Sequence, residues 1–119
     1  MKTKIMLALT TVAFAFAANA AQDPLPEIVF VPENAQVIEA EEKWFGGFEL
    51  EAKVSGGTLL DISEKAKAFY TDKGFTLSME QVDADDIELL FVKDKESVEV
   101  DLELEHNGVI EYSVDYETR

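Results

Sequence analysis

Acidic and apolar residues alternate across positions 98–116, with the turn-forming triplet His-Asn-Gly at 106–108. This period of two predicts a β-hairpin with one apolar face and one acidic face. A three-residue loop keeps the apolar face intact, because it places Leu104 opposite Ile110 and Gly108 at the left-handed loop position. The carboxylates then share the other face: Glu99, Asp101, Glu103, Glu111 and Asp115.

This acidic face predicts a binding surface for a basic protein or for divalent cations. Glu103 faces Glu111 in the expected register, and each pair of opposed like charges costs about 0.2–1 kcal/mol. Each apolar side chain buried on the other face offsets that cost by about 1.5–3 kcal/mol. The alternative is a solvated face that blocks edge-to-edge aggregation. Acid–base catalysis needs a cleft that shifts carboxylate pKa values, and a flat strand face offers none.

A second group of carboxylates lies in the run Asp-Ala-Asp-Asp-Ile-Glu at 83–88. Calcium takes six to eight oxygen ligands, several of which a loop can supply. The run lacks the central glycine and distal glutamate of a helical calcium loop, so we predict a polar hairpin turn at 82–86 and assign no cofactor. Calcium binding is the alternative, with these candidate ligands: Asp83, Asp85, Asp86 and Glu88.

Trp44 and Phe45 precede two glycines in a predicted hairpin loop at 41–47. Exposed aromatic residues at such a tip can anchor a partner, since Trp is enriched at interface hot spots. The alternative is that Trp44 folds back and closes one end of a small core.

The sequence lacks the usual catalytic signatures. It has no cysteine and one histidine, His106, which lies in the predicted turn, so zinc ligands and a cysteine nucleophile are missing. It also has no glycine-rich phosphate loop and no nucleophile elbow. We therefore predict that the protein is not an enzyme.

The elements that position these groups form one α+β domain over 35–119. We expect two layers, an antiparallel sheet of about five strands in the order β-β-α-β-β-β packed on one helix. The helix follows Thr58, which with Asp61 resembles a capping box, and ends before Gly74 at a left-handed C-cap position. The side on which the first hairpin joins the later strands is left open. The strands expected before the C-terminal hairpin are 35–40, 48–54, 75–79 and 87–92.

The first 34 residues are predicted to be a signal peptide and a leader. Residues 1–20 combine Lys2 and Lys4, an apolar run and an Ala-Asn-Ala cleavage pattern. We therefore expect a protein of the bacterial periplasm or exterior, with no membrane contact after cleavage. Residues 21–34 contain all three prolines and should be an extended leader, in which 28–31 forms an edge strand or packs against the core.

Charge narrows the choice of partner. The net charge is −15, and becomes −17 without the signal, which holds two of the ten basic residues and none of the 25 acidic ones. Such a charge argues against nucleic acid and anionic membranes as partners.

Phe69-Tyr70 near the helix end, followed by Gly74-Phe75 and alternating strands, resembles a type of small exported bacterial α+β domain of mostly unknown function. The proline-containing lead-in at 31–35 is also similar. The resemblance covers about residues 30–116 and implies a fold and an exported location, but no functional residue.

These observations predict a non-enzymatic periplasmic binding or accessory protein. Its acidic sheet face would contact a basic protein or cations, aided by Trp44 and Phe45. The alternatives are a calcium-responsive structural protein and an inhibitor of a cationic secreted enzyme, which the negative charge would steer into contact.

Overall fold

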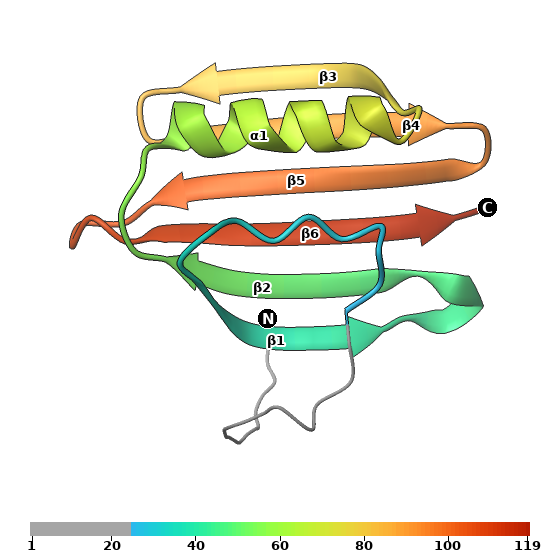
Figure 1. Cartoon of the computed structure of the whole chain (residues 1–119), viewed down its shortest axis with the longest axis horizontal. Helices are drawn as coiled ribbons and strands as arrows, with labels where there is room; N and C mark the ends of the chain where they lie inside the picture. Colours follow the sequence, from blue (N-terminus) through green and yellow to red (C-terminus); the bar gives the residue numbers. More distant parts are fainter. Residues whose placement is uncertain (1–24) are drawn as a thin grey trace.

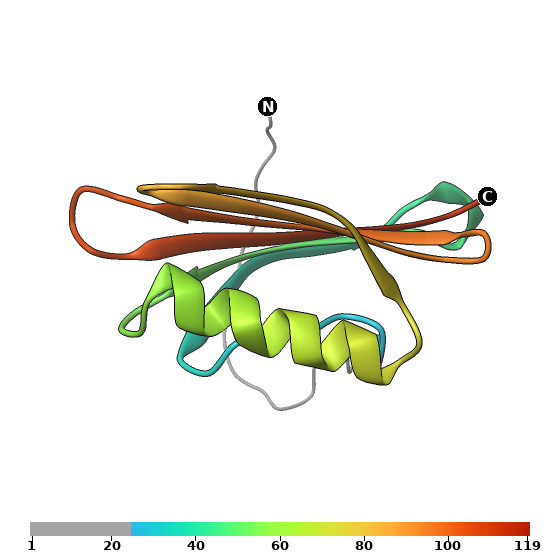
Figure 2. The ribbon, with the colours of Figure 1, turned by 90° about the horizontal axis from the view of Figure 1, so that it is seen from above.

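The computed structural model describes residues 25–119, which form a six-stranded antiparallel sheet with an α-helix against one face (Figures 1 and 2). The predicted α+β class is confirmed. The sheet has six strands rather than about five, because four strands follow the helix. The separately predicted ranges, together with the two strands of the C-terminal hairpin, already amount to six. The predicted signal peptide lies outside the described residues. The elements are β1 (Ala35–Glu42), η1 (Trp44–Gly46), β2 (Phe48–Val54), α1 (Leu59–Asp72), β3 (Thr76–Asp83), β4 (Asp86–Lys93), β5 (Glu96–Leu104) and β6 (Ile110–Thr118).

The strand order is β1-β2-β6-β5-β4-β3, with antiparallel pairing throughout. The first hairpin therefore joins the later strands through β2 and β6, which places the C-terminal hairpin in the centre of the sheet. The edges are β1 and β3. Each edge strand has a register irregularity, between Val37 and Glu39 in β1 and between Leu77 and Met79 in β3. Such bulges discourage pairing with another chain.

The C-terminal hairpin has the predicted register. Leu104 pairs with Ile110 and Val100 with Val114, and Gly108 has a φ of 86° in the turn between them. Because side chains alternate along a strand, this register gives both strands the same buried face. The alternation and the turn chemistry therefore suffice to determine this part of the fold.

The helix begins and ends where its capping residues predict. The Thr58 Oγ1 accepts a hydrogen bond from the Asp61 amide at 3.1 Å, and Gly74 after the C-terminus has a φ of 93°. The helix lies over β3, β4 and β5 and leaves β1, β2 and β6 to another covering segment (Figure 1). Its buried side chains are Leu59, Ile62, Ser63, Ala66 and Tyr70.

Residues 25–34 cover the other half of the same face (Figures 1 and 2). Val29 is buried, and the Phe30 backbone is held by two tyrosines of the core. Its amide donates to the Tyr70 hydroxyl at 3.1 Å, and its carbonyl accepts from the Tyr112 hydroxyl. Of the two expectations for residues 28–31, packing against the core is confirmed and the edge strand is wrong.

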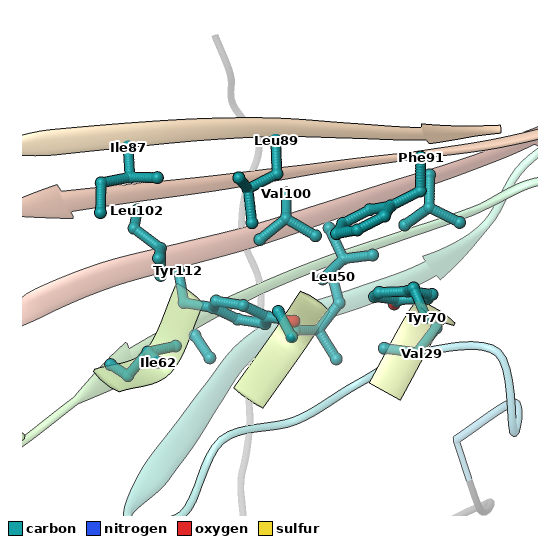
Figure 3. Packing of buried hydrophobic residues seen from close by; sticks show 14 of the residues in the cluster. Val29, Leu50, Ile62, Tyr70, Ile87, Leu89, Phe91, Val100, Leu102 and Tyr112 are labelled. Atoms are coloured by element: carbon teal, nitrogen blue, oxygen red, sulfur yellow. The ribbon is translucent and has the colours of Figure 1, made fainter. Parts of the chain in front are cut away.

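The core lies between the sheet and these two covering segments (Figure 3). Ile62 and Tyr70 of the helix and Val29 of the leader point toward the strands. Burial of each large apolar side chain contributes about 1.5–3 kcal/mol, so this face supplies the main stabilisation of the domain. The sheet contributes Leu50, Ile87, Leu89, Phe91, Val100, Leu102 and Tyr112 to the packing shown in Figure 3.

Candidate functional site

The sheet face opposite α1 carries a dense group of carboxylates, which we call the acidic face. On β5, Val100 and Leu102 are buried on the helix side, so Asp101 between them points to the other side. The same alternation applies to β2, β4 and β6. The acidic face comprises Glu49 and Glu51 of β2, Asp86 and Glu88 of β4, Glu99, Asp101 and Glu103 of β5, and Glu111, Asp115 and Glu117 of β6.

Like charges lie directly opposite one another across this face. Glu103 pairs with Glu111, as the sequence predicts, and Glu88 pairs with Asp101. Each such pair costs about 0.2–1 kcal/mol. The contribution of β4 to the acidic face was not predicted. Asp86 was expected in a turn, and Glu88, within the expected strand 87–92, was expected only as a candidate calcium ligand. Strand order, which alternation within single strands does not reveal, brings Glu88 beside Asp101.

The acidic face contains a hollow of about 440 Å³. Lys53 lines it as a basic residue, and Ile38 of the edge strand β1 adds an apolar side chain. Its carboxylates come from four neighbouring strands, so it is a feature of the sheet rather than of one loop. They are Glu51, Asp86, Glu88, Asp101, Glu103 and Glu111.

Asp86, Glu88 and Asp101 form a compact group within the hollow, which we call the central cluster. One carboxylate oxygen from each lies within 4.8 Å of those of the others. Burial, together with the neighbouring negative charges, of which Glu88 and Glu99 are the strongest, raises the pKa of Asp101 to about 6. Asp86 Oδ1 is buried and accepts no hydrogen bond from residues 25–119. The cluster is therefore a place where a cation, as a metal ion or as a Lys or Arg side chain, would relieve repulsion.

A second group, the distal cluster, contains Glu103, Glu105 and Glu111, again with carboxylate oxygens within 4.8 Å. Of the four candidate calcium ligands proposed from the sequence, the structure places two in the central cluster and two outside it. Asp83 ends β3 and Asp85 lies in the turn, both exposed, whereas Asp86 and Glu88 belong to the central cluster. The predicted turn at 82–86 is too long, because β3 and β4 continue until they pair Asp83 with Asp86.

Trp44 and Phe45 lie at the tip of the first hairpin, 87% and 88% exposed. The alternative in which Trp44 closes the core is therefore wrong. Phe45 has a left-handed backbone, with φ 63° and ψ 29°, within the short helix η1. His106 is also exposed, in the predicted turn.

Hydrogen bonds tie the tip to the end of β6. Lys43 Nζ contacts Asp115 Oδ1 at 2.5 Å and Glu117 Oε2 at 3.1 Å, and the Thr118 hydroxyl donates to the Phe45 carbonyl at 2.6 Å. Partial burial lowers the pKa of Lys43, but its bonds to the two carboxylates raise it above the usual value. Figure 2 shows the connection between β1 and β2 rising on the side opposite the helix. The aromatic tip thus stands beside the acidic face.

Comparison with known proteins found no matching family model, curated protein or solved structure. Among residues 25–119, no helix combines the length and the apolar character needed to cross a membrane. The resemblance to small exported bacterial domains stays a prediction.

Proposed function

We propose that this is a non-enzymatic binding or accessory protein that uses its acidic face to dock a basic protein in the periplasm or outside the cell. The observation that carries the proposal is the hollow, where carboxylates of four neighbouring strands converge and Lys53 is the basic lining residue. A surface of this kind attracts a positively charged partner from a distance and orients it.

The location of the charges favours binding over protection of the sheet edges. Opposed carboxylates reach the free edges β1 and β3, for example where Glu41 faces Glu49. They also lie on the central strands β5 and β6, where Glu103 faces Glu111. Each edge already has a bulge that discourages pairing. The opposed carboxylates of the central strands therefore cost stability at a place where an edge defence is not needed.

The two clusters indicate how a partner would be held. Each gathers three carboxylates within a few ångströms, a spacing that suits the donors of one Lys or Arg side chain. Neighbouring side chains of a basic segment would therefore enter the central and distal clusters together. An inhibitor of a cationic secreted enzyme is one form of the same proposal, since such an enzyme presents the required charge.

The test is a salt-graded binding measurement with two cationic probes, octalysine and lysozyme. The wild-type protein should bind both at low salt and lose most of its affinity at high salt, because exposed charges are screened. The triple variant Asp101→Asn, Glu103→Gln, Glu111→Gln should bind more weakly than a control triple variant altered elsewhere. The control carries Glu33→Gln, Asp72→Asn and Asp94→Asn, at positions that are exposed and lie outside the acidic face. The two triple variants therefore have the same net charge. Equal binding by the two triple variants would refute the proposal.

A calcium-responsive structural protein is the second candidate. It is favoured by the buried Asp86 Oδ1, which has no hydrogen-bond partner among residues 25–119 and lies beside Glu88 and Asp101. Three carboxylates offer six oxygens, within the range that calcium takes. Millimolar calcium should then raise the melting temperature, and Asp86→Asn with Glu88→Gln should abolish the rise. The pair Asp72→Asn and Asp94→Asn should leave it intact, since those residues are exposed and lie outside the acidic face. An unchanged wild-type melt would end this candidate.

A further inference from the structure

The turn between β1 and β2 exposes two aromatic side chains that take no part in the core. The rings of Trp44 and Phe45 have centroids 6.5 Å apart and a mutual tilt of 53°. Both side chains are almost wholly exposed, and both are absent from the core cluster of residues 25–119. They therefore form a small apolar projection on a strongly acidic protein.

The backbone of this turn is held in a conformation that does not suit its residues. Phe45 has a φ of 63°, a region that glycine adopts freely and that a bulky residue adopts only under constraint. The constraint is visible, since the Lys43 amide donates to the Gly47 carbonyl at 2.8 Å and the Thr118 hydroxyl donates to the Phe45 carbonyl. A Cβ added at Gly47 would lie 2.8 Å from the Tyr116 carbonyl oxygen, which shows how tightly the turn presses on β6. Backbone strain of this kind is concentrated at functional sites.

The turn also has a defined place relative to the acidic face. Lys43 bonds to Asp115 and Glu117, which belong to that face, so the aromatic pair stands at its border. Two further carboxylates, Glu41 and Glu42, directly precede Lys43 in the chain. Carboxylates therefore precede the apolar projection in the chain and lie on the strand to which its turn is bonded.

We infer that the Trp44–Phe45 turn is an apolar anchor that enters an aliphatic pocket rimmed by lysine or arginine on a basic protein partner. This inference rests on the proposed function, because the partner is the one held by the acidic face. Charge complementarity selects this occupant. A second copy of the chain, also at net charge −15, would bring acidic residues against acidic residues, and an anionic membrane would be repelled in the same way.

The acidic face and the Trp44–Phe45 turn contribute to different steps of binding. Carboxylates on an open face accelerate encounter and confer salt dependence. A desolvated aromatic anchor slows dissociation, and aromatic residues of this kind dominate the energetics of many interfaces. The anchor would therefore make binding selective for those cationic proteins in which a pocket lies at the correct distance from the partner's basic patch.

Trp44 is the only tryptophan of the chain, so its fluorescence reports directly on the anchor. The probes are octalysine and a peptide of alternating lysine and leucine with the same number of lysines. The alternating peptide should shift the Trp44 emission to shorter wavelength and protect it from acrylamide, whereas octalysine should do neither. The variant Trp44→Ser, Phe45→Ser should bind the alternating peptide about tenfold or more weakly, with its affinity for octalysine unchanged. Circular dichroism should show that it remains folded, because both positions are exposed.

The outcomes separate the anchor from the acidic face. Wild-type affinity of the serine variant for the alternating peptide would overturn the anchor and leave the proposed function standing. Loss of affinity in the serine variant but not in the acidic-face triple variant would overturn the proposed function. An emission shift that grows with protein concentration alone, without peptide, would also overturn the inference, because it would assign the turn to self-association.

Discussion

The two faces of the sheet come from the same strands but have opposite consequences for stability. The face toward α1 is covered by the helix and the leader, and its side chains are packed into one core. The other face places Glu103 against Glu111 and Glu88 against Asp101, where each pair of like charges opposes folding. The covered face thus stabilises the domain, and the repulsion on the acidic face destabilises it. The proposed contact with a basic partner would account for residues of the central strands that cost stability.

The largest expected effect on stability comes from a comparison of substitutions at two neighbouring residues of β5. Leu102→Ala should lower the free energy of unfolding by about 2–5 kcal/mol, because it removes a fully buried side chain and leaves a cavity. Asp101→Ala, one position away, should leave the free energy unchanged or raise it, because it removes a carboxylate from a repulsive cluster. Urea denaturation at neutral pH measures both. Similar losses in the two variants would contradict the assignment of the faces.

The leader should be an integral part of the covered face. Tyr70→Phe removes the acceptor of the Phe30 amide and should cost about 1–2 kcal/mol. Hydrogen exchange at the Phe30 amide should become faster, while exchange within β5 should change no more than global stability requires. Unaltered protection of Phe30 would show that the leader is held in another way.

Asp101 should make stability fall as pH rises, whereas an ion-paired carboxylate makes stability rise with pH. Burial and like charges raise its pKa from 3.8 to about 6 in the folded protein. Between these values the folded state binds more protons than the unfolded state, so stability falls as pH rises through this window. The loss should be roughly 1 kcal/mol once solvent screening is allowed for. Asp101→Asn should flatten this part of the curve of melting temperature against pH, and an equally steep curve would rule out Asp101 as its source.

The smallest effect concerns the aromatic tip. Phe45→Gly should raise stability by about 0.5–1 kcal/mol, because glycine adopts the left-handed backbone without strain. Gly46→Ala is the matched control and should lower stability by a similar amount, since Gly46 has a φ of 85°. Thermal melts of the two variants should move in opposite directions. A destabilised Phe45→Gly variant would mean that the Phe45 side chain contributes to the fold.

Local features of the fold were predictable from the sequence, and the pairing of distant segments was not. The register across Leu104 and Ile110 follows from alternation and turn chemistry, and the helix ends follow from Thr58 and Gly74. The pairing of β2 with β6 joins residues far apart in the chain, and several strand orders have the same alternating pattern. The length of β3 was underestimated because its second half, residues 80–83, is exposed and does not continue the alternation of residues 75–79.

In the candidate site, too, local features were predictable and contacts between separate strands were not. The carboxylates of β5 and β6 were placed correctly because a single hairpin contains them. The central cluster was missed because Asp86 and Glu88 meet Asp101 only through the β4–β5 pairing. The exposure of Trp44 depends on how the tip is fixed to β6 by Lys43, and composition does not reveal that.

The claim that the acidic face is the docking surface can be tested most directly by mapping backbone amide shifts during a titration with octalysine at low salt. The perturbed amides should lie in β2, β4, β5 and β6 around the hollow, centred on Asp101 and Glu103, and those of α1 and residues 25–34 should remain unaffected. Perturbations centred on the helix or the leader, or spread evenly over residues 25–119, would contradict this claim.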